Sequence, residues 1–76
     1  MTYPIEMKNA EDALRVSNEA SRAGIDLSVS VGTIILDPRS LLALFTLIGM
    51  KAVLVAPDNT DPEAFMRLIK RMGVAA

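Results

Sequence analysis

The sequence contains no cysteine, no histidine and no tryptophan, and only one tyrosine and two phenylalanines. Without cysteine the chain has no disulfide and no thiol nucleophile, and without histidine as well it lacks the usual zinc ligands. The missing histidine also excludes a Ser-His-Asp triad and a phosphohistidine. Because no set of residues supplies a nucleophile, a base and an oxyanion stabiliser together, we expect a protein that is not an enzyme.

The chain also lacks a large net charge of either sign. Eight Lys and Arg stand against nine Asp and Glu, for a formal net charge of -1. This balance gives no basic surface for nucleic acid or an anionic membrane. The longest apolar run, 41–50, is interrupted by Thr46 and Gly49, and it falls short of the ~20 residues that a membrane-spanning helix needs. The first six residues also lack the features of a secretory signal, so we expect a cytoplasmic protein.

The length fits one small folded unit. Seventy-six residues are about half of the ~150 residues that serve as a prior for one domain, and we expect residues 1–76 to form a single domain. A hydrophobic fraction of 51% is sufficient for a core. Domains of this size bury only ~60% of the surface that the unfolded chain exposes, so the net stability should be small.

The first strand is predicted at residues 2–7. Tyr3, Ile5 and Met7 alternate with polar neighbours, which is the period of a half-buried strand. Pro4 cannot donate a hydrogen bond to a ladder and is tolerated mainly at a sheet edge. We therefore place this strand at an edge of the sheet.

Three further strands follow from the same kind of pattern. Residues 25–31 alternate strictly between apolar and polar side chains, which indicates one buried face. Gly32 can take the positive φ of a tight turn, and the apolar, partly β-branched residues 33–37 then suit the return strand of a hairpin. The turn type stays open. Residues 51–55 predict the fourth strand.

Two helices are marked by their capping residues. Asn9 is a favourable N-cap for a helix over 10–23, and Gly24 is a natural residue to end it. Asp61 is the corresponding cap of a helix over 62–72, followed directly by a proline at the first helical position. Between these two, a short apolar helix is predicted to run to about residue 48.

The resulting order is β-α-β-β-α-β-α, which predicts an α+β fold. A four-stranded antiparallel sheet covered on one face by three helices satisfies the alternation. The predicted core collects the apolar faces of these elements: Ile5, Val16, Ala20, Leu27, Val29, Ile35, Leu54, Phe65, Leu68, Ile69 and Met72.

This order and two motifs resemble the histidine-containing phosphocarrier HPr of the bacterial sugar phosphotransferase system. The segment Ile35-Leu36-Asp37-Pro38-Arg39-Ser40-Leu41-Leu42 is similar to the family's strand, basic residue and serine that lead into its short second helix. The segment Asn9-Ala10-Glu11-Asp12-Ala13 falls where the family has His-Ala-Arg-Pro-Ala at the start of its first helix. The resemblance covers nearly the whole chain and implies the family's open-faced β-sandwich.

The resemblance implies that the family's phosphoryl chemistry is lost here. Asn9 stands at the position of the phosphorylated histidine, and a carboxamide does not accept a phosphoryl group. Glu11 stands at the position of the arginine that steadies the phosphate, and its charge would repel that phosphate. We expect Asn9 to have a structural role as a helix cap.

The serine of the second motif has two interpretations. Ser40 matches the serine that a dedicated kinase phosphorylates in some HPr proteins, which makes it a candidate site of regulatory phosphorylation. Alternatively it only caps the second helix, a role worth ~1 kcal/mol against alanine. Asp37 could also be the cap of that helix, with Pro38 at its first position.

The second helix is unusually apolar for a helix at the rim of a small domain. Leu41, Leu42 and Phe45 match the positions with which HPr proteins contact enzyme I and other partners. They are therefore candidates for a docking patch, for a surface covered by a second copy of the chain, or simply for the core.

The leading hypothesis is a non-catalytic, HPr-like protein that acts in regulation through protein contacts. Its partners would be phosphotransferase system components or HPr kinase. The alternative is a ferredoxin-like module that binds a small ligand or dimerises, in which the first strand lies inside the sheet. We expect no cofactor and no metal, because Asp58, Asn59 and Asp61 are too few oxygen ligands for calcium, and no glycine-rich phosphate loop is present.

Overall fold

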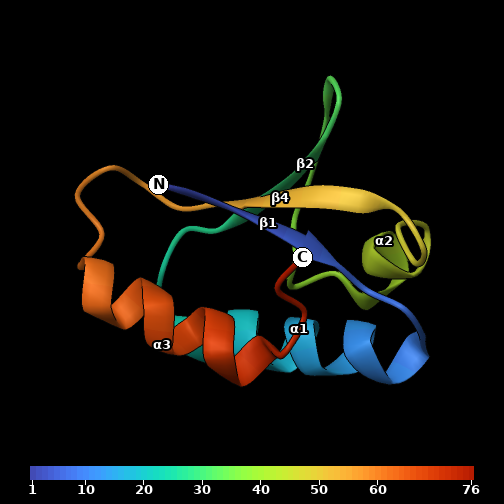
Figure 1. The fold of residues 1–76 in the computed structure, drawn as a ribbon, viewed down its shortest axis with the longest axis horizontal. Coiled ribbons are helices and arrows are strands. Elements are labelled where there is room, and N and C mark those ends of the chain that lie inside the picture. The colour runs from blue at the N-terminus through green and yellow to red at the C-terminus, as the bar shows by residue number, and fades with distance from the viewer.

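The computed structural model describes residues 1–76, and its elements follow the predicted order (Figure 1). They are β1 (Thr2–Glu6), α1 (Ala10–Ala23), β2 (Ser28–Val31), β3 (Ile34–Leu36), α2 (Leu41–Phe45), β4 (Lys51–Val55) and α3 (Pro62–Met72). None of the helices combines the length and the apolar character needed to cross a membrane.

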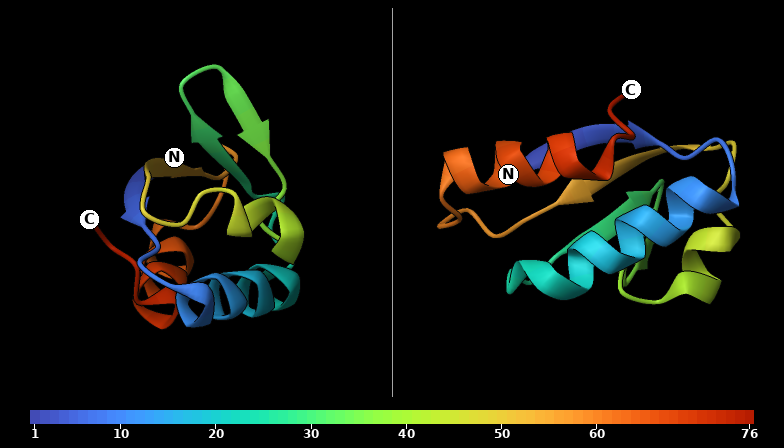
Figure 2. Two further views of the ribbon diagram at one scale, coloured as in Figure 1. Left: turned by 90° about the vertical axis from the view of Figure 1, so that its right-hand side faces the viewer. Right: turned by 90° about the horizontal axis from the view of Figure 1, so that it is seen from below.

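The four strands form one antiparallel sheet in the order β1-β4-β2-β3. The helices α1 and α3 lie side by side beneath one face of this sheet, and α2 lies beside α1 (Figures 1 and 2). The predicted edge position of β1 is confirmed. A ferredoxin-like fold would place that strand inside the sheet, so the structure contradicts the alternative fold.

The proline in β1 is accommodated by the direction of its backbone. Residues of a strand point their N–H and C=O groups alternately to the two sides. The Glu6 N–H donates to the Val74 carbonyl (2.9 Å), and the Ala76 N–H donates to the Pro4 carbonyl (3.1 Å). The missing N–H of Pro4 therefore lies on the side away from β4, and the C-terminal residues cover this edge of the sheet.

The β2–β3 hairpin closes through two residues, Gly32 and Thr33. Val31 pairs with Ile34, Gly32 has φ 59°, and no residue other than glycine has a positive φ. A positive φ at the first central residue alone is typical of a type II′ turn, whereas type I′ needs it at both. The hairpin projects away from the helices, above the rest of the sheet (Figures 1 and 2).

The core lies between the sheet and the helices, and the predicted core residues are buried with one exception. Ile35 is 70% exposed. Its partner in the ladder is Ser30, which also pairs with Val53, and these side chains lie on the face without helices. Consecutive strand residues face opposite sides, so Ile34 and Ile35 could not both point to the core.

The prediction also missed part of the core. Its additional apolar members lie just after β1, in α1, in and after α2, in and after β4, and near the C-terminus: Met7, Ala13, Leu44, Leu47, Ala52, Ala56 and Val74.

The second helix is shorter than predicted. It spans Leu41–Phe45, and the chain then tightens into turns rather than continuing as an α-helix to residue 48. The Thr46 hydroxyl donates to the Ala43 carbonyl (2.6 Å), and the Thr46 N–H donates to the same carbonyl. Such contacts three residues apart are typical of a helix end that narrows into 3₁₀-type turns.

The buried face of α3 gives the first prediction. Leu68 is fully buried, whereas Met66 on the same helix is 41% exposed. Leu68→Ala should lower the free energy of unfolding by ~2–5 kcal/mol, because it removes buried methyl groups and leaves a cavity. Met66→Ala is the matched control and should cost well under half as much. Urea denaturation followed by circular dichroism measures both, and equal losses would contradict the assignment of this face.

Candidate functional site

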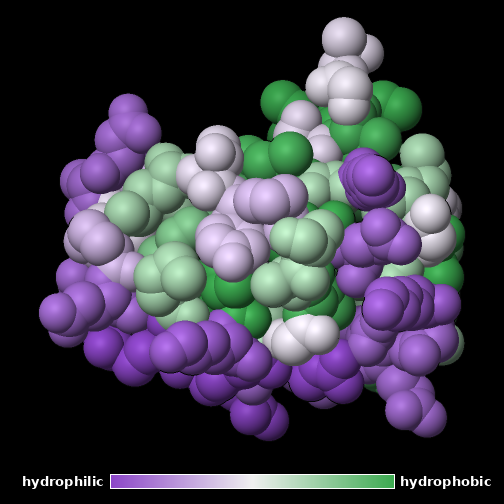
Figure 3. Space-filling model, viewed as in Figure 1, coloured by the Kyte–Doolittle hydropathy of each residue, from purple (hydrophilic) through white to green (hydrophobic).

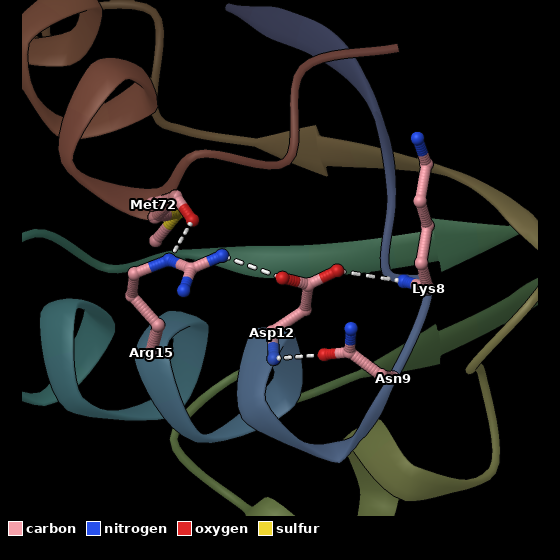
Figure 4. A network of polar contacts seen from close by, with 5 residues as sticks. All are labelled: Lys8, Asn9, Asp12, Arg15 and Met72. Atoms are coloured by element: carbon pink, nitrogen blue, oxygen red, sulfur yellow. Dashed lines mark hydrogen bonds and ion pairs between the residues drawn. The ribbon is translucent and has the colours of Figure 1, made fainter.

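The first turn of α1 is closed by its neighbouring side chains (Figure 4). Asn9 has the extended backbone of an N-cap, and its Oδ1 accepts a hydrogen bond from the Asp12 N–H (2.9 Å). Asp12 Oδ2 in turn accepts from the Lys8 N–H (2.8 Å). This reciprocal arrangement is a variant of the capping box, and it confirms the predicted structural role of Asn9.

Arg15 connects this turn to the end of α3. Its Nη2 donates to Asp12 Oδ1, and its Nε donates to the Met72 carbonyl at 2.7 Å. The close approach depends on Gly73, where a Cβ atom would lie only 3.3 Å from Arg15 Nε. Gly73 also has φ 66°, so two separate reasons favour glycine at this position.

Asp12 and Arg15 form an ion pair at this site. The Lys8 N–H that Asp12 accepts, followed by the hydrogen bond and charge of Arg15, holds the pKa of the Asp12 carboxyl below its ordinary value. The Arg15 guanidinium is correspondingly engaged by a carboxylate and a helix-terminal carbonyl. The positive charge closest to Asn9 along α1 is therefore already neutralised by Asp12.

Glu11 does not join this network. Its side chain is exposed and makes no hydrogen bond or ion pair. The exposed start of α1 thus carries a carboxamide that caps the helix and a free carboxylate beside it. Neither group is a phosphoryl acceptor of the histidine type.

The segment before α2 has its own ion pair. Arg39 Nη2 lies 3.1 Å from Asp37 Oδ2, and the Arg39 N–H and Nε donate to Asp37 Oδ1. Hydrogen bonds from Arg39 lower the pKa of Asp37, and Asp37 raises the pKa of Arg39. The Arg39 guanidinium is therefore bound by the Asp37 carboxylate.

Ser40 is the cap of α2. Its Oγ accepts a hydrogen bond from the Ala43 N–H (3.3 Å), and the residue is exposed. The Arg39 carbonyl just before it accepts from the Ser17 hydroxyl (3.0 Å), which ties this segment to α1. Of the two predicted caps of this helix, Ser40 is confirmed and Asp37 is not. Phosphorylation of Ser40 stays a prediction.

The apolar side chains of α2 divide between core and surface. Leu41 is partly buried and packs against the core. Leu42 is 79% exposed and Phe45 is 40% exposed, and their spacing of three residues places them side by side on the helix. We call Leu42 and Phe45 the α2 patch.

The acidic loop residues have structural partners. Asp58 Oδ1 lies 3.3 Å from the amino group of Met1, and Asp61 Oδ1 accepts from the Glu63 N–H (3.2 Å) as the cap of α3. No cluster of acidic side chains in the structure is arranged to hold a metal ion.

The fold matches solved structures of phosphocarrier proteins. A histidine-containing phosphocarrier protein from a mycoplasma superposes with a TM-score of 0.71 at 12% identity, over 95% of this chain and 91% of that one. HPr-C-His from Thermoanaerobacter tengcongensis gives a TM-score of 0.69 at 20% identity, over 100% of this chain and 97% of that one. The chain therefore has the HPr fold. No protein-family model and no curated protein matches the sequence.

Sequence analysis missed the roles of Asp12 and Arg15. Their spacing of three residues on a helix was a signal that they could pair. The contact of Arg15 with the Met72 carbonyl had no such signal, because it joins residues 57 positions apart.

The Asp12 network gives a prediction about pH. The fold lowers the pKa of Asp12 below its ordinary value of 3.8. The ionised carboxyl therefore contributes stability that is fully present above that value and is lost as pH falls through the folded pKa. Asp12→Asn should reduce stability at pH 7, and the difference from the natural sequence should shrink as the pH drops below 4.

Urea denaturation at several pH values measures this difference. Glu11→Gln removes one negative charge from the same turn without removing a hydrogen bond, and it serves as the control. A constant difference between Asp12→Asn and the natural sequence from pH 7 to pH 2 would contradict the prediction.

Proposed function

We propose that this chain is a non-enzymatic HPr-like protein that carries no phosphoryl group and acts through protein contacts. Its place would be in regulation of the phosphoenolpyruvate-dependent sugar phosphotransferase system. The observation that carries this proposal is the start of α1. There the HPr fold is retained, Asn9 is a helix cap, and Asp12 neutralises Arg15.

Loss of the phosphoryl acceptor follows from the chemistry of the residues present. A carrier must accept a phosphoryl group on a nucleophilic atom and release it again. The chain has no histidine at all, and the Asn9 oxygen is engaged by the Asp12 N–H. Glu11, exposed beside it, would repel an incoming phosphate.

The α2 patch supports a role in protein contacts. Leu42 and Phe45 leave much of their apolar surface in water, and adjoining exposed apolar side chains of this kind often mark an interaction site. The resemblance to HPr suggests enzyme I or another phosphotransferase component, or HPr kinase, as the partner. Leu41 is partly buried against the core. Only its exposed part would contact the partner.

Ser40 adds a candidate regulatory position next to this patch. Its hydroxyl is exposed and lies two residues before Leu42. Phosphorylation would add a charge of about −1.5 to −2 at the border of an apolar surface. That charge would have to be desolvated when a partner binds, so phosphorylation of Ser40 would weaken docking.

The first test concerns phosphoryl transfer. The intact protein is incubated with enzyme I and phosphoenolpyruvate, and its mass is measured under conditions that preserve phosphohistidine. We expect no adduct, and none for Asn9→His, because Glu11 would still oppose the phosphate. A functional HPr is the positive control. An adduct on the natural sequence would overturn the proposal, and an adduct on Asn9→His alone would show that the histidine was the only function lost.

The second test concerns the α2 patch. Phe45→Lys and Leu42→Lys place a charge on exposed positions, so both should fold, as checked by circular dichroism. Each should weaken binding to enzyme I or HPr kinase by at least about tenfold in calorimetric titration, because central apolar contacts dominate such interfaces.

The matched control for this test is Met66→Lys. Met66 is also exposed and apolar, with 41% of its surface accessible, but it lies on α3. Undiminished binding of both α2 variants would rule out the patch as the docking surface. Unfolding of Phe45→Lys would instead assign Phe45 to the core.

A further inference from the structure

The two edge strands of the sheet, β1 and β3, differ in whether another segment covers their outer side. The outer edge of β1 is occupied by the chain's own C-terminus, through hydrogen bonds to Glu6 and Pro4 and a bridge between Ile5 and Ala75. The outer edge of β3 has no such cover. Natural proteins usually protect an edge strand by making it short or by giving it lysine, proline or a bulge. The β3 strand, Ile34–Leu36, is short, but it carries no lysine, proline or bulge.

The free backbone groups at this edge belong to Ile35. In a hairpin with a two-residue loop, the pair that flanks the loop is a hydrogen-bonded pair, and here it is Val31 and Ile34. The next pair, Ser30 and Ile35, is then non-hydrogen-bonded. The N–H and C=O of Ile35 therefore point away from β2 and have no partner in the chain.

The side chains at this edge are apolar and exposed. Ile35 is 70% exposed on the helix-free face, and Ile34 is 58% exposed on the opposite face. Figure 3 shows hydrophobic residues gathered just below the tip of the projecting hairpin. An exposed apolar edge with free backbone groups is a template for another strand.

We propose that the β3 edge pairs with the β3 edge of a second copy of this chain, antiparallel and centred on Ile35. A two-fold axis through this position would join two four-stranded sheets into one sheet of eight strands. Such an isologous contact uses the same surface on both copies. The Ile35 N–H of each copy would donate to the Ile35 carbonyl of the other.

A second copy is the occupant because the sequence around Ile35 is self-complementary. The segment Thr33-Ile34-Ile35-Leu36-Asp37 has apolar residues on either side of its centre and polar residues at both ends. Antiparallel pairing about Ile35 sets Ile34 against Leu36 of the other copy, twice. The exposed side chain of Ile34 would thus be covered by an apolar partner on the same face.

The ends of the segment are complementary as well. The same register sets Thr33 against Asp37 of the second copy, a hydroxyl donor against a carboxylate acceptor. A carboxylate has about four acceptor sites, and hydrogen bonds from Arg39 use three of those of Asp37. One site remains for Thr33. The net charge of -1 for each copy opposes the association only weakly.

The contact is small, so we expect a dimer of modest affinity whose population depends on concentration. Sedimentation velocity from micromolar to millimolar protein should show a monomer that converts to a dimer. Ile35→Lys should raise the dissociation constant at least about tenfold, because a charged side chain on an edge strand blocks further pairing. Since Ile35 is exposed, this variant should keep its fold.

Two matched variants distinguish the β3 edge from other apolar surfaces. Leu42→Lys changes the α2 patch, and Met66→Lys changes the exposed face of α3. Both should leave the dimer unchanged. A chain that remains monomeric at millimolar concentration overturns the proposal, as does loss of the dimer in Leu42→Lys with the dimer retained in Ile35→Lys. These outcomes are independent of binding to enzyme I or HPr kinase.

A crosslinking test reads out the register directly. The chain has no cysteine, so a single introduced thiol reports one position. The Cα atoms of a hydrogen-bonded antiparallel pair lie about 5.5 Å apart, within the range of about 4.4–6.8 Å that a disulfide spans. Ile35→Cys should form a disulfide-linked dimer under mild oxidation several times faster than Met66→Cys. Equal rates for the two variants would contradict the proposed register.

Discussion

The Arg15 guanidinium joins the start of α1 to the last carbonyl of α3, and the path of the C-terminus depends on that junction. Immediately beyond Met72, Gly73 turns the chain so that residues 74–76 pair with the outer edge of β1. A charged group that bonds a carbonyl contributes about 1.5–3 kcal/mol, whereas the exposed pair of Arg71 with Glu19 between the same helices contributes about 0–1 kcal/mol. Arg15 is therefore the stronger of the two polar links between these helices.

The same junction determines the chemistry at the start of α1. Asp12 accepts hydrogen bonds from both Arg15 and the Lys8 backbone, so the charges of Asp12 and Arg15 are paired with each other. Asn9 completes the turn as its cap. Phosphoryl carriage requires an exposed nucleophile and a free cation at such a place. Asn9, Asp12 and Arg15 stabilise the helix instead.

The α2 patch and the β3 edge are both apolar and exposed, and they differ in the groups that they offer to a partner. The α2 patch is made of side chains on one helix, and the proposed partner would cover it with a complementary apolar surface. The β3 edge offers backbone hydrogen bonds as well as side chains, and a strand satisfies it best. Figure 2 shows α2 and β3 on the side of the molecule opposite β1. The two proposed contacts therefore use different residues of the chain.

The sequence by itself determined the element order, the caps Asn9 and Asp61, and the edge position of β1. These depend on local periodicity, on side chains that bond the adjacent backbone, and on proline's missing donor. Only the tertiary structure decided the rest. The side on which Ile35 lies depends on strand register, the end of α2 depends on competing hydrogen bonds of Thr46, and the Arg15 link depends on the packing of α3 against α1. Strand register and the Arg15 link join groups that are distant in the sequence, and at Thr46 two local hydrogen-bond patterns compete, so a local pattern alone decides none of the three.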